Sequence, residues 1–72
     1  MANLPTSNVR RLLGEGAGDI RISTEAVAKG IEAAEVFLHR LGERAASIAR
    51  GHGRKTVMPE DLETARHQIL PG

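Results

Sequence analysis

Cysteine is absent from this 72-residue chain, which excludes a disulfide framework and a thiolate metal site. Tryptophan and tyrosine are absent too, and Phe37 is the one aromatic residue. A core of alanine, valine, leucine and isoleucine has little bulk per residue, and a chain of this size is close to the lower limit for folding alone. We therefore expect much of its stability to come from association with a partner.

Long apolar runs are missing as well. No stretch approaches the length of a membrane span, and the start Met-Ala-Asn-Leu-Pro has neither the basic nor the apolar region of a signal peptide. We predict a soluble, cytoplasmic protein with no membrane partner. The three histidines, His39, His52 and His67, do not stand at ligand spacing, so we expect no metal site and no cofactor.

Catalytic groups are not gathered in any recognisable pattern. Glu32 and Glu35 are three residues apart and share a face of a predicted helix, but no nucleophile or base accompanies them. They are most simply explained as surface charges. We predict that the protein is not an enzyme.

An excess of charge of one sign is also lacking, since ten Lys and Arg face nine Asp and Glu, for a net charge of +1. This sum argues weakly against a general polyanion binder. Eight of the ten cations, however, are arginine, which suits bidentate contact with phosphate. The cations gather near predicted helix ends, at Arg10 with Arg11, at Arg21, and at Arg54 with Lys55.

What the chain does have is one long amphipathic segment, from Ser23 to His52. Its apolar residues recur with alternating spacings of four and three, and the segment contains no proline. Ser23 is a good N-cap residue. The segment is predicted to be one helix whose apolar stripe forms a dimer core: Val27, Ile31, Ala34, Leu38, Leu41, Ala45 and Ile48.

Two shorter helices are predicted on either side. The first is capped by Thr6 or Ser7 and runs to about Gly14, and the last begins at Pro59, a residue favoured in the first turn. The loops between the helices contain short extended, β-like segments at residues 19–22 and 53–57. Neither short helix covers both sides of the long one, whereas two crossed copies would. An ordinary coiled coil is an alternative, but it leaves the apolar faces of the short helices unexplained.

The second loop carries a specific pattern. Gly-Arg-Lys-Thr-Val precedes Pro-Glu-Asp-Leu, and Arg54, Thr56 and Asp61 fit the order Arg-x-Thr-x-x-x-x-Asp. The chain resembles the archaeal-type histones here and over nearly its whole length. The resemblance implies an all-α, single histone-fold domain without tails over residues 1–72. It also implies an intertwined handshake homodimer.

The resemblance further implies that double-stranded DNA is the partner. Arg21 stands where family members insert an arginine into the minor groove, and the other residues would contact phosphate. Arg54 would be structural, paired with Asp61. The implied DNA contacts are Thr6, Ser7, Arg10, Arg11, Arg21, Lys55 and Thr56.

Assembly beyond the dimer is left open by the sequence. Members that stack dimers end to end use a histidine near the end of the long helix, and here Gly51 stands at that place with His52 one residue later. Face-to-face and bacterial members share a Thr-Ser-x-Val-basic-basic start, which this chain has from Thr6 to Arg11. Both tetramer geometries remain alternatives.

Two functions are compatible with these features. The first is a chromosomal, nucleoid-associated protein that binds DNA without sequence specificity and bends, wraps or compacts it as a dimer or tetramer. The second, which the net charge of +1 favours, is a histone-fold protein that serves as an interaction partner with little DNA binding.

Overall fold

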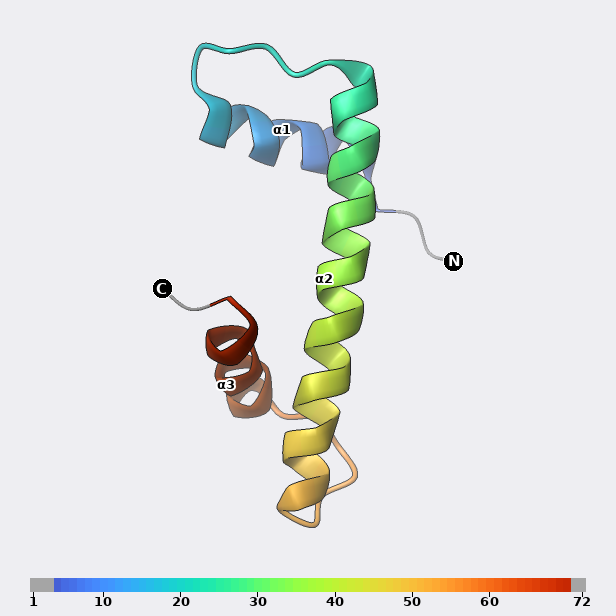
Figure 1. Ribbon diagram of the computed structural model, residues 1–72, viewed down its shortest axis with the longest axis vertical. Coiled ribbons are helices and arrows are strands. Elements are labelled where there is room, and N and C mark those ends of the chain that lie inside the picture. The colour runs from blue at the N-terminus through green and yellow to red at the C-terminus, as the bar shows by residue number, and fades with distance from the viewer. Residues whose placement is uncertain (1–3, 71–72) are drawn as a thin grey trace. The chain divides into compact units, whose positions relative to one another are not determined.

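Three helices make up the computed structural model, which describes residues 4–70 (Figure 1). They are α1 (Thr6–Ala17), α2 (Thr24–Gly51) and α3 (Pro59–Ile69). The all-α class and the order short, long, short are confirmed. Both loops are irregular and contain no strand within residues 4–70, as expected for lone extended segments without a neighbouring strand.

Helix α1 differs from the prediction at both ends. It runs past Gly14 and Gly16 to Ala17 and ends at Gly18, whose φ of 73° is the left-handed conformation that glycine adopts without strain. Its N-cap is Pro5 rather than Thr6 or Ser7. Pro5 has an extended ψ of 121°, and its carbonyl accepts the N–H of Val9 at 3.1 Å. Thr6 and Ser7 are therefore already helical residues.

Helix α2 begins as predicted. The hydroxyl of Ser23 accepts the N–H of Ala26 at 3.0 Å, which satisfies one of the free donors of the first turn. At the other end, Gly53 adopts a φ of 73°, and the N–H of Arg54 returns to the carbonyl of Ala49 at 2.9 Å. This reversal directs the chain towards α3.

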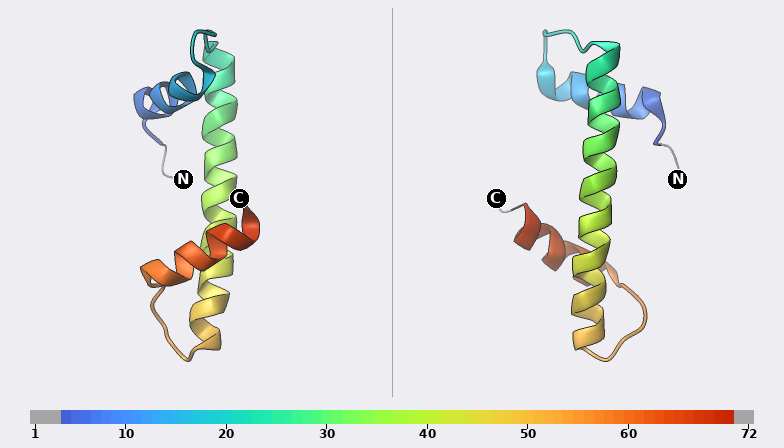
Figure 2. Two further views of the ribbon diagram at one scale, coloured as in Figure 1. Left: turned by 90° about the vertical axis from the view of Figure 1, so that its left-hand side faces the viewer. Right: turned by 45° about the vertical axis from the view of Figure 1, so that its right-hand side comes forward.

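The chain divides into two compact units, Met1–Val36 and Phe37–Gly72, and α2 contributes to both. In the first unit, α1 packs on the first half of α2 around the buried Val27 (Figure 2). A Cβ added at Gly30 would lie 2.8 Å from a terminal carbon of Leu13. Glycine at this position therefore allows the close approach of the two helices.

In the second unit, α3 packs on the second half of α2 through alanines. Ala45 and Ala65 are completely buried and Ala49 is 2% exposed, which permits close contact between the helix backbones. The side chain of Arg44 on α2 donates to Gln68 on α3 at the edge of this contact. Asp61 is the one buried charged residue among those described.

The predicted apolar stripe of α2 is only partly covered by the chain itself. Val27 and Ala45 are buried, whereas Leu38, in the middle of the stripe, is 52% exposed. The other members are half-buried: Ile31, Ala34, Leu41 and Ile48.

Candidate nucleic-acid interface

The N-terminus of α1 presents hydroxyls and backbone donors to solvent. Thr6 and Ser7 are exposed at the first two helical positions. Proline at the cap offers no side-chain acceptor to the first-turn N–H groups, and that turn contains no acidic side chain. Free N–H groups at the positive end of a helix dipole attract anions such as phosphate.

Arg10 and Arg11 lie one turn further along α1 and are both exposed. Arg11 pairs with Glu15 at 2.9 Å, but both side chains are more than half exposed, so the pair contributes little and a phosphate could replace the carboxylate. Arg10 donates to the carbonyl of Ile22 at 3.2 Å and so links α1 to the loop that follows it. No sequence pattern indicated this contact of Arg10.

The first loop carries Arg21 in an exposed position. Within residues 4–70, no hydrogen bond or ion pair holds its side chain, and no acid neutralises it. Ile20 beside it is 68% exposed, which makes the tip of this loop both cationic and apolar.

In the second loop, the structure brings Arg54 and Asp61 together. The guanidinium donates two hydrogen bonds to the carboxylate, at 2.5 and 2.8 Å, in bidentate geometry. Asp61 is 2% exposed, and the same guanidinium lies 3.4 Å from the carbonyl of Thr56. The pair therefore fixes the path of the second loop against the start of α3.

Asp61 makes a second structural contact that was not predicted from the sequence. Its Oδ2 accepts the N–H of Met58 at 2.8 Å, which caps α3 although methionine is a poor N-cap residue. The sequence did contain a signal for this cap, because the acidic residue Asp61 stands three positions after Met58, the residue before Pro59. Two hydrogen bonds lower the pKa of Asp61 to about 2: the one from Arg54 has the larger effect, and the one from the N–H of Met58 has the smaller. The hydrogen bond with Asp61 likewise raises the pKa of Arg54.

This pKa predicts an acid-sensitive contribution to stability. The pKa of an aspartate in the unfolded chain is ~3.9, so the unfolded state binds the proton first as the pH falls. The stability that Asp61 contributes is therefore complete above about pH 5 and is progressively lost as the pH falls towards 2. We expect the difference in melting temperature between the wild type and Asp61→Asn to shrink over this range. A difference that stays constant from pH 5 to about pH 2 would contradict the assignment.

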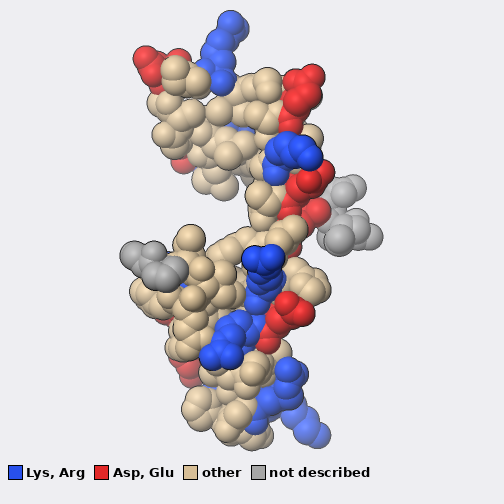
Figure 3. Space-filling model, viewed as in Figure 1, with Lys and Arg blue, Asp and Glu red and all other residues tan. Residues whose placement is uncertain are grey.

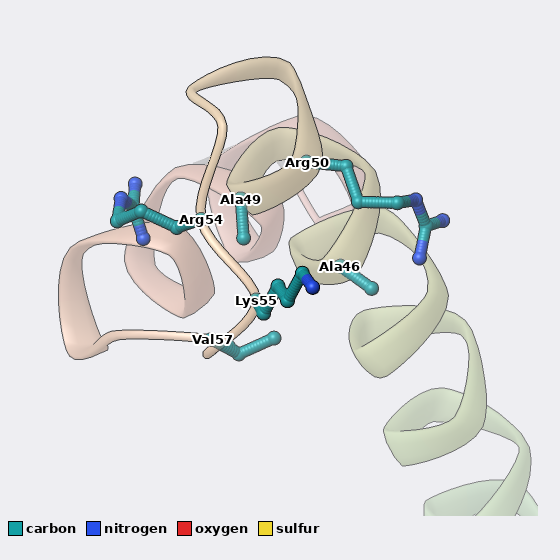
Figure 4. Close-up of a pocket in the computed structure, with 6 residues that line it drawn as sticks. All are labelled: Ala46, Ala49, Arg50, Arg54, Lys55 and Val57. Carbon is teal, nitrogen blue, oxygen red and sulfur yellow. The ribbon is translucent and has the colours of Figure 1, made fainter.

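Lys55 and Thr56 are both exposed in the second loop. Lys55 lies over a hollow of about 230 Å³. Figure 4 shows the Lys55 side chain extending towards Ala46, whereas the side chains of Arg50 and Arg54 extend away from the hollow. Arg50, which was not among the predicted contacts, is exposed in the last turn of α2. The hollow is lined by Ala46, Ala49, Arg50, Arg54, Lys55 and Val57.

Positive charge is concentrated in the second unit. Residues 37–72 contain six Lys and Arg against four Asp and Glu, whereas residues 1–36 contain four against five. Figure 3 shows several basic side chains along one face of this second unit, with few acidic ones among them. This charge distribution suits contact with a polyanion better than the net charge of the whole chain does.

Residues 4–70 contain no group of three or more His, Cys, Asp or Glu placed to hold a metal ion. Nor is any helix among them sufficiently long and apolar to cross a bilayer.

Comparison with known proteins defines the family. Residues 2–65 match the family described as histone-like transcription factor (CBF/NF-Y) and archaeal histone. One subunit of the archaeal histone HAN1 from Thermococcus zilligii is 38% identical over 65 residues, which are 90% of this chain and 96% of that protein. With its histone-type order of helices, the chain therefore belongs to the family of histone-like transcription factors (CBF/NF-Y) and archaeal histones, and it is a DNA-binding chromatin protein.

Proposed function

We propose that the chain forms a handshake homodimer that binds double-stranded DNA without sequence specificity and bends or wraps it on the chromosome in the cytoplasm. One observation carries this proposal. The residues implied in DNA contact are all exposed, whereas the basic residue implied to be structural, Arg54, is held by the buried Asp61. The exposed set is Thr6, Ser7, Arg10, Arg11, Arg21, Lys55 and Thr56.

The dimer is supported by how little the single chain buries. Its buried apolar residues are one valine and three alanines: Val27, Ala45, Ala49 and Ala65. A core of this size does not offset the conformational entropy of so many ordered residues. Crossing of two α2 helices at Leu38 would cover the exposed centre of the stripe in both copies.

The DNA surface is assembled from backbone-reading groups. In the handshake arrangement, the first loop of one protomer lies beside the second loop of its partner, which would bring Arg21 near Lys55 and Thr56. Arg21 would enter the minor groove, and the cations and helix amides around it would contact phosphate. Binding of this kind reads the shape and charge of the duplex rather than its bases.

The test is a mobility-shift titration of random-sequence duplex across ionic strength. A protein that neutralises six or more phosphates loses about 10³-fold or more in affinity between 50 and 200 mM salt, because bound counterions are released. We expect a loss of this order. Binding that is absent at low salt, or that is nearly independent of salt, would contradict the proposal.

Arg21→Ala is the most informative variant in that titration. Its side chain is exposed and makes no contact that holds the fold within residues 4–70, so the thermal transition should stay within about 2 °C of the wild type. DNA affinity should fall roughly tenfold, similarly for all sequences. Ser47→Ala, an exposed change elsewhere on α2, is the control. A large loss of helicity in Arg21→Ala would contradict this role.

A second candidate function is that of a protein-interaction partner with little DNA binding. Residues 1–36, which include α1 and the first loop, contain more acidic than basic residues. The relative from Thermococcus zilligii is, in addition, named as one subunit of its histone. The same titration distinguishes the two candidates, since a pure interaction partner would show no salt-dependent affinity for duplex.

A further inference from the structure

The loop between α1 and α2 is held at its two ends by hydrogen bonds to the helices. At its start, the N–H of Gly18 donates to the carbonyl of Gly14 at 3.0 Å. At its end, the hydroxyl of Ser23 caps the first turn of α2. Arg21 and Ile22 lie between these ends, and within residues 4–70 no backbone–backbone hydrogen bond involves either of them. Their conformation therefore depends on side-chain contacts.

Arg10 supplies a hydrogen bond to this stretch from the middle of α1. Its Nη1 donates to the carbonyl oxygen of Ile22 at 3.2 Å, across twelve positions of the sequence. Figure 1 shows that the loop turns back along α1 before it enters α2, which brings the two groups together. A hydrogen bond from a charged donor is stronger than one between neutral groups. Because Ile22 directly follows Arg21, the contact fixes the backbone beside the exposed cation of the loop.

Arg11, the next residue of α1, is held in a different way. Both arginines are exposed, but their side chains leave the helix about 100° apart. Arg11 pairs at 2.9 Å with Glu15 of the same helix, and a phosphate can replace this exposed carboxylate. The acceptor of Arg10 is instead a carbonyl of the loop. If Arg10 turned towards a phosphate, the loop would lose its hydrogen bond to the middle of α1.

We propose that Arg10 is a positioning residue, which acts on DNA binding through Arg21 by holding the loop between α1 and α2 in one conformation. The inference rests on the proposed function, in which Arg21 enters the minor groove. An arginine on a loop with many conformations loses backbone entropy when it binds, and this loss lowers its affinity. A loop that Arg10 already holds avoids most of the loss, because its backbone is ordered before DNA binds.

A direct phosphate contact by Arg10 would have different consequences. It would contribute to affinity whether or not Arg21 is present, and its removal would lower the slope of log affinity against log salt by about one. The removal of a positioning residue has an effect only while Arg21 is present, and that effect cannot exceed the affinity that Arg21 supplies. A double-mutant cycle therefore distinguishes the two roles.

The test is this cycle, measured by mobility shift on random-sequence duplex. The substitutions are Arg21→Ala and Arg10→Met, which keeps a long side chain without a donor. We expect Arg10→Met to lower the affinity about fivefold in the wild type and less than about twofold in Arg21→Ala. Arg11→Met is the matched control. As an independent phosphate contact, it should lower the affinity by the same factor in both backgrounds and reduce the salt slope by about one.

The free protein gives a second readout, which does not depend on DNA. Backbone order parameters of Arg21 and Ile22, from nitrogen-15 relaxation, should be near the ~0.85 of a rigid backbone in the wild type. They should fall towards ~0.6 in Arg10→Met and stay unchanged in Arg11→Met. Because both substituted residues are exposed, each variant should melt within about 2 °C of the wild type.

Equal losses of affinity for Arg10→Met in the two backgrounds would overturn the inference and make Arg10 a phosphate contact. Unchanged order parameters of the loop in Arg10→Met would overturn it as well. Full affinity of Arg21→Ala would contradict the proposed role of Arg21, and the absence of duplex binding would contradict the proposed function. Either of these results removes the basis of the inference, even where the order parameters show that Arg10 holds the loop.

Discussion

Replacing Asp61 with alanine is expected to lower the melting temperature by at least roughly 10 °C. Asp61 is 2% exposed and accepts three hydrogen bonds, two from Arg54 and one from the N–H of Met58. The truncation leaves the guanidinium without its partner, removes the cap of α3 and frees the second loop. The measurement is thermal unfolding followed by circular dichroism at one fixed protein concentration, since the transition of a dimer depends on concentration.

The matched control is Glu63→Ala, which removes exposed contacts to Arg66 and His67 on the same helix. Glu63 lies 2.8 Å from Arg66, and its side chain is 61% exposed, so solvent screens the pair. Its loss should move the transition by no more than about 3 °C. Arg54→Ala should resemble Asp61→Ala, because both variants break the same contact. Similar falls in melting temperature for Asp61→Ala and Glu63→Ala would show that the buried pair of Arg54 and Asp61 stabilises the fold no more than an exposed pair does.

Much of the architecture could be predicted from local signals in the chain. The alternation of four and three in the apolar residues predicted α2, and Ser23 marked its start because a serine hydroxyl satisfies a first-turn donor. Pro59 marked the start of α3 for the complementary reason, since proline lacks the donor that would otherwise be free. These signals depend only on residues within one or two turns.

The errors at α1 arose where two local tendencies compete. Gly14 and Gly16 each cost roughly 1 kcal/mol relative to alanine in a helix, which predicted an early end. The helix nevertheless continues, with Arg11 and Glu15 paired across Gly14. At the other end, Thr6 and Ser7 are good capping residues, but Pro5 already has the extended ψ of a cap. The choice between adjacent caps depends on backbone geometry that composition does not reveal.

In the candidate site, too, some contacts could be predicted from the sequence and others could not. The pairing of Arg54 with Asp61 was implied by the family pattern, because both residues belong to it. The hydrogen bond from Arg10 to Ile22 was not, since it depends on the path of the loop between α1 and α2. The capping of α3 by Asp61 was missed because Met58, which stands at the cap position, is itself a poor N-cap, and the acceptor comes from three positions later.

The second large effect is expected for Leu38→Asp, which places a carboxylate at the centre of the proposed dimer. Leu38 is 52% exposed in the single chain, so nothing within residues 4–70 encloses an acid there. In a two-fold symmetric dimer, however, the crossing of two α2 helices would bury both new carboxylates close together. We expect the dimer dissociation constant to rise at least about 100-fold. At micromolar concentration the helical signal should be largely lost, because the separated chain has too small a core to stay folded.

Val36→Asp is the matched control, because both residues are 52% exposed on the same helix and both changes introduce the same charge. Two residues along a helix turn the side chain by about 200°, so the two substitutions act on opposite faces. If only the inner face meets the handshake partner, Val36→Asp keeps the dimer and its helicity while Leu38→Asp loses both. Equal tolerance of the two changes would mean that α2 does not cross a partner at Leu38, and the dimer core would have to lie elsewhere. Equal loss of dimer and helicity would instead show that α2 does not tolerate an acid on either face. The quantity to measure is therefore the difference between the two variants in dimer dissociation constant and helicity.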